Sequence, residues 1–352
     1  MLEGPAEQAI LKAGQWLADQ FAYRRVSKKF SKFARDYIRN GDLTRNQVRL
    51  ATRSALKEAL LVRKSPHAFS SLRFFALRRS EPLADFVDAQ EYWRTFHRLW
   101  GGPTRAVTDA KTLTRKLLGT AAIPDIGYFV GGRWFDKDWQ ITSLDVLVSR
   151  LPASQEVVLK ADFSERGNAV EIMPASELLN PNRIMTANSV LQRKIEQHTF
   201  FSELSGGKGC TIRITTVFWP SESKPQLVAA LVKWDVVGDQ DTSRVNLDVK
   251  TGAVVPPIFG PSWTRLALPD RLLSGRELVV PGFEAAIELV LELHSKSPHY
   301  QLIGWDLIVD AEQNPWIFEW NADHPAIFNL QSQNGPVLKE GAVTQVSGRR
   351  RR

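Results

Sequence analysis

The fold is decided by two apolar runs near the C-terminus: Gly304-Trp305-Asp306-Leu307-Ile308-Val309 and, after Asn314-Pro315, Trp316-Ile317-Phe318-Glu319-Trp320-Asn321. Their lengths and the polar turn between them predict a β-hairpin. Burying Asp306 and Glu319 in such strands costs free energy, which a cation, a buried partner or solvent on one face must offset. Alternation along the second strand places Glu319 and Asn321 on one face, opposite Phe318 and Trp320.

The polar residues of this hairpin suit a hard metal ion. Asp306, Glu319 and Asn321 supply two carboxylates and one amide oxygen. Mg²⁺ accepts such a partial set of oxygen ligands and keeps positions for water and nucleotide phosphate. We therefore predict a magnesium site at the hairpin, with ATP as the first ligand to test.

Composition places the chain among ordinary soluble proteins. Its 352 residues are 43% hydrophobic and 24% charged, enough for a sizeable core and more than one subdomain. No apolar run reaches the roughly 18 residues of a membrane span, and the N-terminus lacks the layout of a secretory signal. We expect a cytoplasmic protein, with peripheral membrane association left open. Cys210 is the single cysteine, which excludes an intramolecular disulfide and a Cys-based zinc cluster, and we expect it to be buried.

Positive charge is concentrated at the two ends. Residues 1–80 hold 17 Lys/Arg against 6 Asp/Glu, a net charge of +11, and Arg349 to Arg352 add +4. Residues 81–348 hold 25 basic and 32 acidic residues, a net charge of −7. The basic region is able to bind an anionic membrane surface or another phosphate-rich acceptor, and a solvated helical face is the alternative. Specific nucleic-acid binding is not expected, because the aromatic residues recur at core-like helical spacing.

Three regions are predicted along the chain: a basic helical N-terminal region over 1–100, a mixed α and β domain over 101–335, and a flexible Arg-rich tail over 336–352. Periodicity and turn signals give the element boundaries. Helices are predicted over 48–62, 85–99, 109–120, 139–149 and 281–295, and strands over 126–130, 156–163, 211–218, 226–236 and 244–249.

Two lysines are candidates for phosphate contacts. Lys160 ends an apolar strand beside the turn that follows Phe163, where its ammonium group can reach a phosphate. The alternative is a lysine that extends into solvent at a strand end. Lys111 lies near the start of a predicted helix and indicates little by itself.

The order of these elements resembles the ATP-grasp superfamily over about residues 101–330, and most closely its sugar-transfer-associated branch. The resemblance is carried by a helix that begins Asp-x-Lys, an Ile-Pro strand, a Val-x-Lys strand with its turn, and the terminal hairpin. The most specific segments are Val190-Leu191-Gln192-Arg193-Lys194-Ile195-Glu196-Gln197-His198, Thr211-Ile212-Arg213-Ile214-Thr215-Thr216, and Gly304-Trp305-Asp306 through Glu319-Trp320-Asn321.

This resemblance implies an α+β fold in which two subdomains clamp ATP, preceded here by the helical region. It also implies an ATP- and Mg²⁺-dependent ligase. Such an enzyme phosphorylates a small-molecule carboxylate, and an amine or similar nucleophile then attacks the acyl phosphate. The branch suggests surface-polysaccharide or cell-envelope metabolism. Two alternatives remain open: a kinase that phosphorylates a hydroxyl group, and a non-catalytic basic adaptor.

The resemblance also assigns residues. Lys111 and Lys160 correspond to the lysines that contact phosphate, and Arg213 to a guanidinium that stabilises the transferred group. A structural ion pair is the alternative role of Arg213. The implied cofactor-binding residues are Lys111, Lys160, Gln192, Lys194 and Ile195, and the segment from Gln192 to Ile195 is implied to line the adenine pocket. The implied catalytic residues are Arg213 and Lys160, and the implied magnesium ligands are Asp306, Glu319 and Asn321.

Some features depart from the family pattern or stay unassigned. The phosphate loop over 163–168 keeps one glycine and carries a glutamate, and a second loop over 238–246 is shortened. Backbone approach to phosphate is therefore less favoured at both loops. His198 is expected to be structural, and His324 is a candidate for the substrate side.

Overall fold

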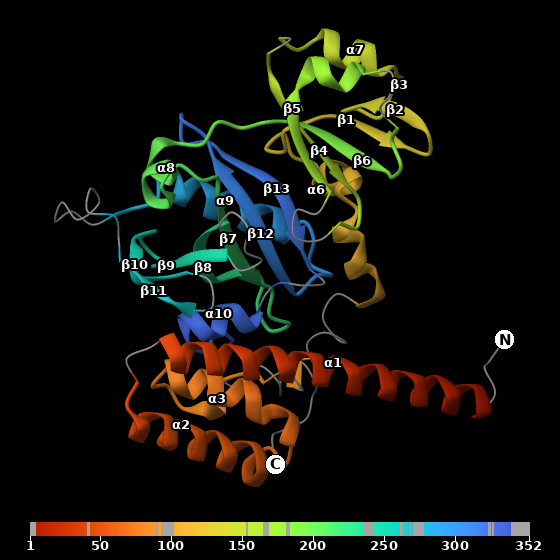
Figure 1. The fold of residues 1–352 in the computed structure, drawn as a ribbon. Helices are drawn as coiled ribbons and strands as arrows, with labels where there is room; N and C mark the ends of the chain where they lie inside the picture. Colours follow the sequence, from red (N-terminus) through yellow and green to blue (C-terminus); the bar gives the residue numbers. More distant parts are fainter. Residues whose placement is uncertain are drawn as a thin grey trace.

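The computed structural model describes residues 5–338 except 41–42, 89–90, 93–101, 153, 165–168, 181–183, 236–241, 261–262, 268, 270–277, 323–324 and 326. Three parts are visible in Figure 1: a helical layer, a six-stranded sheet and a seven-stranded sheet. The predicted boundary near residue 100 and residues 339–352 of the predicted tail over 336–352 lie outside the described residues. The division into three regions therefore stays a prediction.

The helical layer comes first in the chain. Its elements are α1 (Pro5–Asn40), α2 (Arg45–Lys57), the π-helical turn η1 (Glu58–Val62), the 3₁₀ turn η2 (Pro66–Ala68), α3 (Phe69–Arg78) and the 3₁₀ turn η3 (Leu83–Asp85). Helix α2 begins where it does because Thr44 and Gln47 form a capping box: the Gln47 N–H donates to Thr44 Oγ1 at 3.2 Å, and Thr44 N–H donates to Gln47 Oε1 at 2.8 Å. The predicted helix over 48–62 is thus confirmed, with an earlier start.

Helix α3 packs against both α1 and α2. Phenylalanines from α1 and α3 form the core of the layer, and Trp263 from the sheet domain lies 5.0 Å from Phe74, ring centre to ring centre. Arg78 joins the layer to the rest of the molecule. Its guanidinium lies 4.0 Å from the Phe259 ring and 4.2 Å from the Trp263 ring, and its Nε donates to the Ser332 carbonyl at 2.8 Å.

The six-stranded sheet is antiparallel, with strand order β3-β2-β1-β6-β4-β5. Its strands are β1 (Asp125–Val130), β2 (Arg133–Asp136), β3 (Ile141–Thr142), β4 (Glu156–Ala161), β5 (Val170–Pro174) and β6 (Ser189–Arg193). Around it lie η5 (Gly102–Asp109), η6 (Lys111–Leu113), α6 (Thr114–Leu118), α7 (Leu144–Ser149) and η7 (Ala175–Leu179).

The seven-stranded sheet is also antiparallel, with strand order β11-β10-β9-β8-β7-β12-β13. Its strands are β7 (Cys210–Val217), β8 (Gln226–Asp235), β9 (Thr242–Leu247), β10 (Val254–Phe259), β11 (Arg265–Leu266), β12 (Leu302–Val309) and β13 (Pro315–Asn321). The predicted terminal hairpin is β12–β13, and β12 also pairs with β7. The hairpin therefore lies beside the Thr-x-Arg strand in the sheet.

Helices cover the two faces of this second sheet differently. Helix α9 (Phe283–Ser295) buries Ala286, Val290 and Leu293 in the main core, which also contains Trp305 and Trp320. Helix α8 (Thr199–Ser205), which precedes β7, packs Phe201 and Leu204 into the same core. On the other face, Leu330 of α10 (Ile327–Asn334) packs against Ala229 and Leu231 of β8. The face opposite α9 is the one that carries charged side chains.

Three predicted helices differ from the structure. Over 109–120 the chain forms the 3₁₀ turn η6 and then the short helix α6, so Lys111 lies in a tighter turn than predicted. Over 139–149 the helix begins only at Leu144, because Ser143 caps it and Ile141–Thr142 pairs as a strand. Over 85–99, η3 ends at Asp85 and Phe86 has an extended backbone, while residues 93–99 lie outside the described part.

Candidate active site

The candidate site is built on the charged face of the seven-stranded sheet. Asp306 on β12 lies directly opposite Arg213 on β7 and directly opposite Glu319 on β13. Residues opposite one another in an antiparallel pair share a face of the sheet. The three side chains therefore form a row across three adjacent strands, and Lys233 of β8 extends that row by one strand.

Asp306 is held by two cations. Arg213 donates to it twice, from Nε to Oδ1 at 2.7 Å and from Nη2 to Oδ2 at 2.6 Å, and the Lys233 Nζ lies 3.1 Å from Oδ1. Burial raises the pKa of Asp306, but the charges of Arg213 and Lys233 outweigh burial and lower that pKa below its ordinary value. The carboxylate of Asp306 is therefore ionised. Both a structural ion pair with Arg213 and metal binding require this negative charge.

Glu319 is different, because its carboxylate has neither a hydrogen bond nor an ion pair with any residue in the described part of the chain. Burial raises its pKa, and the neighbouring negative charge of Asp306 raises it further. A half-buried carboxylate beside a like charge is stabilised by any cation placed between the two. This chemistry fits a divalent metal at the hairpin.

Metal binding at this point would draw on few protein ligands. Among the described residues, no group of three or more His, Cys, Asp or Glu is arranged to hold a metal ion. The available set is Asp306, Glu319 and the amide of Asn321, with Asp306 already shared between two cations. Such a site suits an ion that brings its own oxygen ligands, as Mg²⁺ does when it arrives with nucleotide phosphates.

Unpaired polar atoms gather around Gly304 on the same face. Within the described structure, three buried atoms have no hydrogen-bond partner here: Arg213 Nη1, Thr215 Oγ1 and Asn321 Nδ2. Thr215 and Asn321 lie opposite Gly304 on its two neighbouring strands. A Cβ at position 304 would lie 2.7 Å from Arg213 Nη1, so the glycine leaves room for the guanidinium. These buried donors are suited to an oxygen-rich ligand.

A β-bulge changes one prediction for the hairpin. Asp306 pairs with Glu319 and Leu307 with Ile317, which leaves Phe318 as an extra residue between them. Trp320 lies in the core as predicted, but Phe318 does not share its environment: the Phe318 ring lies 4.4 Å from the Lys160 Nζ. Strict alternation was therefore wrong at Phe318, and the bulge brings the hairpin into contact with β4.

Lys160 consequently lies at the junction of the two sheets. Burial lowers the pKa of its ammonium group to about 8, and the negative charges of Glu319 and Asp125 partly oppose this effect. Lys160 is half-buried rather than extended into solvent, so the solvent-exposed alternative does not describe it.

Lys111 reaches the loop that follows β4. Its Nζ donates to the Ser164 carbonyl at 2.9 Å, and the Lys111 side chain is buried. The adjacent Thr112 donates from its backbone N–H and from its hydroxyl to the two oxygens of Asp162, at 2.9 and 2.8 Å. These bonds fix Lys111 to the start of the predicted phosphate loop, of which residues 165–168 lie outside the described part, as does the second glycine-containing loop over 236–241.

The three residues predicted to line the adenine pocket are placed differently from one another. Gln192 is buried and donates from Nε2 to Asp125 Oδ1 at 2.8 Å, so its side chain is hydrogen-bonded within the six-stranded sheet. Lys194 forms an ion pair with Glu156, and Ile195 is half-buried in the connector between the sheets. The structure does not bring these three side chains to the charged row, and their assignment to adenine stays a prediction.

The connector ends in two structural contacts. Gln197 accepts from the Cys210 N–H at 2.7 Å and donates to the Cys210 carbonyl, which binds the connector to β7. His198 accepts from the Phe200 N–H at 3.1 Å and so caps α8, a structural role as expected. Cys210 is buried, also as expected. His324 lies outside the described residues.

Lys233 is the member of the charged row that the sequence prediction missed. It lies in the apolar run Leu227 to Trp234, where a lone lysine is as unexpected as Asp306 is in its own run. A lysine within an apolar strand-like run was therefore the sequence signal that could have identified Lys233.

A family model matches the C-terminal part of the chain. Residues 182–347 match the family model described as sugar-transfer associated ATP-grasp. The match includes β6, the charged row and the hairpin, and it confirms the resemblance to the ATP-grasp superfamily and to this branch of it. The α+β ATP-grasp fold, preceded by a helical region, is likewise confirmed. No curated protein matches the chain.

The chain is similar to several solved structures at low sequence identity. The ATP-grasp ligase PsnB complexed with minimal precursor is 12% identical, with a TM-score of 0.40, over 70% of this chain and 64% of PsnB. For the D-alanine-D-alanine ligase from Coxiella burnetii the values are 10%, 0.37, 68% and 57%, and for the L-amino acid ligase from Bacillus licheniformis 13%, 0.37, 78% and 53%. The chain thus spans less than two thirds of each of these proteins, and the substrates in their names are not transferred to it.

Proposed function

We propose that the chain is an ATP- and Mg²⁺-dependent ligase that forms ADP and activates a small-molecule carboxylate for attack by an amine or similar nucleophile. The observation that carries the proposal is the row of Lys233, Arg213, Asp306 and Glu319 across four adjacent strands, with unpaired buried donors beside it. Phosphoryl transfer depends mainly on positioning and charge stabilisation, and this row supplies both without a protein nucleophile.

Each residue has a defined part in this proposal. Lys111 and Lys160 bind phosphate oxygens of ATP, and Arg213 offers its unpaired Nη1 to the group that is transferred. Asp306, Glu319 and Asn321 hold Mg²⁺, which when bound neutralises phosphate charge. The ammonium group of Lys233 exchanges its partner Asp306 for an incoming anion, because the Lys233 side chain is 29% exposed.

The proposed chemistry has two balanced steps. A carboxylate oxygen of the substrate attacks the γ-phosphorus, the bond from that phosphorus to the bridging oxygen of ADP breaks, and an acyl phosphate forms. An amine then attacks the acyl carbon, releases inorganic phosphate and loses one proton. The description of the matched family supports a place in surface-polysaccharide or cell-envelope metabolism, and we propose a cytoplasmic location because ATP is supplied there.

Glu319→Gln tests the metal assignment without disturbing the ion pair. Asp306→Asn would leave Arg213 buried beside a neutral side chain, at a cost of about 3–5 kcal/mol of stability. Glu319 has no partner to lose, so Glu319→Gln should fold normally and reduce ADP release by roughly 100-fold or more. Glu312→Gln is the matched control, because Glu312 is exposed in the turn of the same hairpin.

The assay incubates the protein and Mg·ATP with pools of amino acids, amines and sugar acids, and measures ADP and AMP. ADP release, lost in Glu319→Gln and kept in Glu312→Gln, supports the ligase. Full turnover in Glu319→Gln refutes the metal assignment, and AMP release indicates adenylation instead. Hydroxylamine separates the ligase from a kinase, because only an acyl phosphate gives a hydroxamate. Absence of Mg·ATP binding in calorimetry would favour the non-catalytic adaptor.

A further inference from the structure

Helix α2 and the turn η1 present an outward surface that mixes leucine with lysine and arginine. The inward residues of this segment are the buried alanines Ala51, Ala55 and Ala59. The outward residues recur at spacings of three and four, so they share one face. We call this face, made of Leu50, Arg53, Lys57, Leu60 and Leu61, the α2 outer face. Leu50 is 51% exposed, Leu60 45% and Leu61 71%.

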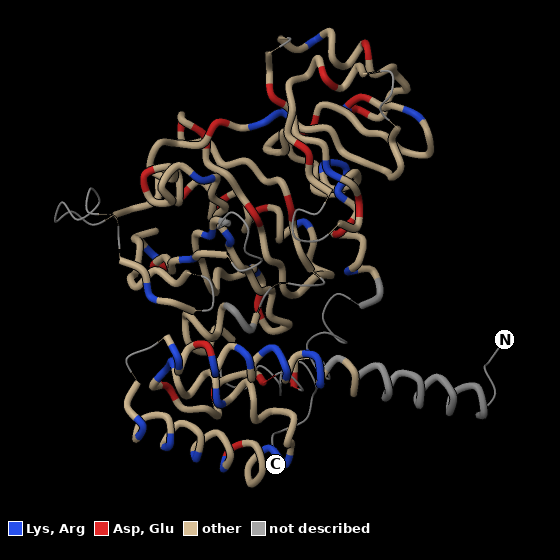
Figure 2. The backbone as a smooth tube through the Cα atoms, in the orientation of Figure 1, with Lys and Arg blue, Asp and Glu red and all other residues tan. Residues whose placement is uncertain are grey.

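The charge around this face has one sign. Among the described residues from 21 to 64, no Asp or Glu is exposed: Asp36 is partly buried, and Glu58 binds Arg63 at 3.1 Å. The exposed cations of the same residues lie on α1 and along α2 to Lys64, where Figure 2 shows them in blue. They are Arg24, Arg25, Lys28, Lys29, Lys32, Arg35, Arg39, Arg45, Arg49, Arg53, Lys57 and Lys64.

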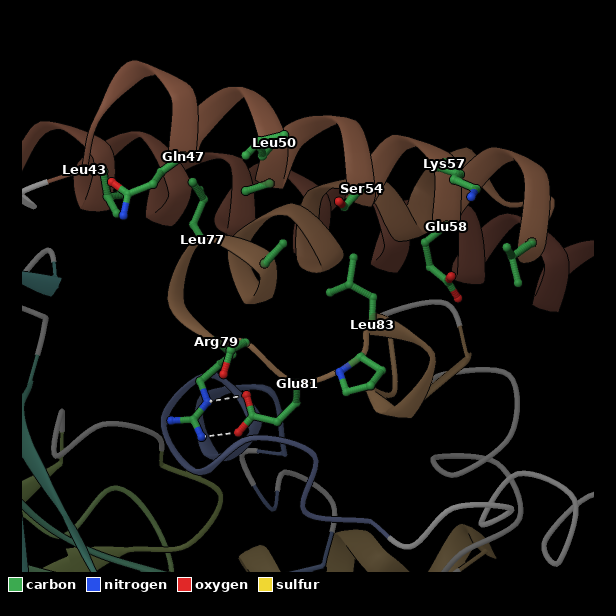
Figure 3. A pocket seen from close by; sticks show the side chains of 15 residues that line it. Leu43, Gln47, Leu50, Ser54, Lys57, Glu58, Leu77, Arg79, Glu81 and Leu83 are labelled. Atoms are coloured by element: carbon green, nitrogen blue, oxygen red, sulfur yellow. Dashed lines mark hydrogen bonds and ion pairs between the residues drawn. The ribbon is translucent and has the colours of Figure 1, made fainter.

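The α2 outer face is directed away from the catalytic part of the molecule. Helix α2 lies on the side of the helical layer that is far from both sheets (Figure 1). A groove of about 640 Å³ runs between α2 on one side and the end of α3 with the segment that follows it on the other, and Figure 3 shows Leu43 and Leu50 on the first side and Leu77 and Leu83 on the second. The groove extends the apolar surface inward from Leu50, while Arg79 and Glu81 are paired at its edge.

We propose that the α2 outer face docks the protein onto an anionic phospholipid bilayer. The exposed leucines enter the boundary between headgroups and acyl chains, and the surrounding lysines and arginines bind lipid phosphates, as in interfacial helices. No helix in the described part of the chain is long and apolar enough to cross a membrane. The inference goes beyond the proposed catalytic function and does not depend on nucleotide.

The aliphatic residues decide between lipid and nucleic acid as the partner. Both partners attract the cations, but proteins that bind single-stranded nucleic acid without sequence preference place aromatic rings against the bases. Leu60 and Leu61 offer no such ring, and their burial in a bilayer removes apolar surface from water. A phospholipid bilayer binds both the leucines and the cations of the α2 outer face, so lipid is the partner that fits this face.

The test is sedimentation with vesicles of phosphatidylcholine alone or with 30% phosphatidylserine, a composition chosen to carry about the charge of an anionic leaflet. Three variants of the full chain are compared: Arg49→Gln with Arg53→Gln and Lys57→Gln, Leu60→Ser with Leu61→Ser, and, as the matched charge control, Lys137→Gln with Lys224→Gln and Lys250→Gln. All the substituted side chains are exposed, so each variant should keep the melting temperature of the parent within a few degrees.

We expect binding to the serine-containing vesicles only. The loss of Arg53 and Lys57 at the face and of the neighbouring Arg49 should weaken this binding about 100-fold, and the loss of two leucines at least tenfold, while the control triple variant should bind like the parent. Three results would overturn the proposal: no binding to anionic vesicles, equal weakening by the control variant, or full binding by the Leu60→Ser/Leu61→Ser protein together with competition by a single-stranded oligonucleotide. ADP release by the same variants is measured separately, so a failure of docking is distinguishable from a failure of the ligase.

Discussion

Protonation of His294 should destabilise the protein at mildly acid pH. His294 projects from α9 into the main core and is fully buried. Its Nε2–H donates to the Tyr300 carbonyl at 2.6 Å, and its Nδ1 accepts from the Thr216 hydroxyl at 2.6 Å. Thr216 Oγ1 in turn accepts from Trp305 Nε1–H at 2.8 Å. This chain of bonds requires the neutral imidazole, since every proton in it is already committed.

The size of the effect follows from the pKa. Burial lowers the pKa of His294 from 6.5 to about 4 in the folded protein. Between pH 4 and pH 6.5 the imidazole is protonated in the unfolded chain but not in the folded one. The contribution of His294 to the free energy of unfolding is therefore fully present above about pH 6.5 and decreases as the pH falls. At 1.36 kcal/mol per pKa unit, the loss is about 2 kcal/mol at pH 5 and about 3 kcal/mol at pH 4.

The assay is urea unfolding at pH 7 and pH 5, followed by tryptophan fluorescence, for the parent and for His294→Gln. Glutamine carries one amide donor and one amide acceptor but takes no proton in this range. The carboxylates titrate in both proteins, so the difference between the two pH-dependent losses isolates His294 and should be about 2 kcal/mol. His299→Gln, at an exposed position, should behave like the parent. Equal losses in the parent and in His294→Gln would refute the reasoning.

Two further predictions concern Gly304 and Arg78. Gly304→Ala places a methyl group 2.7 Å from Arg213 Nη1, so it should shift the guanidinium and reduce ADP release at least tenfold, with a change in the free energy of unfolding of about 1–3 kcal/mol; unchanged turnover would show that Arg213 is not needed in its present position. Arg78→Met removes the contact with the Trp263 ring and the bond to the Ser332 carbonyl. It should cost about 2 kcal/mol in urea unfolding and speed limited proteolysis of the helical layer, whereas equal proteolysis rates would contradict this role.

The sequence predicted the hairpin well because its signals are local. Two strand-length apolar runs around a turn predict the hairpin and bring Asp306 within reach of Glu319, but the exact pairing of these two residues depends on a bulge. The bulge at Phe318 could not be predicted, because alternation assumes one residue per pairing position and an extra residue leaves no mark in the pattern. The contact between Phe318 and Lys160 depends on that bulge.

Other parts of the site depend on contacts between distant segments. Gln192 carries the family motif, yet its side chain is engaged by Asp125, 67 residues earlier in the chain. Lys111 was expected on a helix, but the bonds from Thr112 to Asp162 hold that segment in a tight turn against β4. Such tertiary hydrogen bonds override local helix propensity, and the hydrophobic periodicity of the sequence contains no information about them.

The position of Trp263 in the core of the helical layer has a consequence for synthesis. Helices α1 and α3 leave the ribosome early, but Phe33 and Phe74 cannot pack fully until Trp263 has been made. Trp263 follows Arg78 by 185 residues, which take about 10–40 s to translate at 5–20 residues per second. During that interval Phe33 and Phe74 lack their Trp263 partner, so the helical layer completes its aromatic core only after the segment that follows β10 has been made.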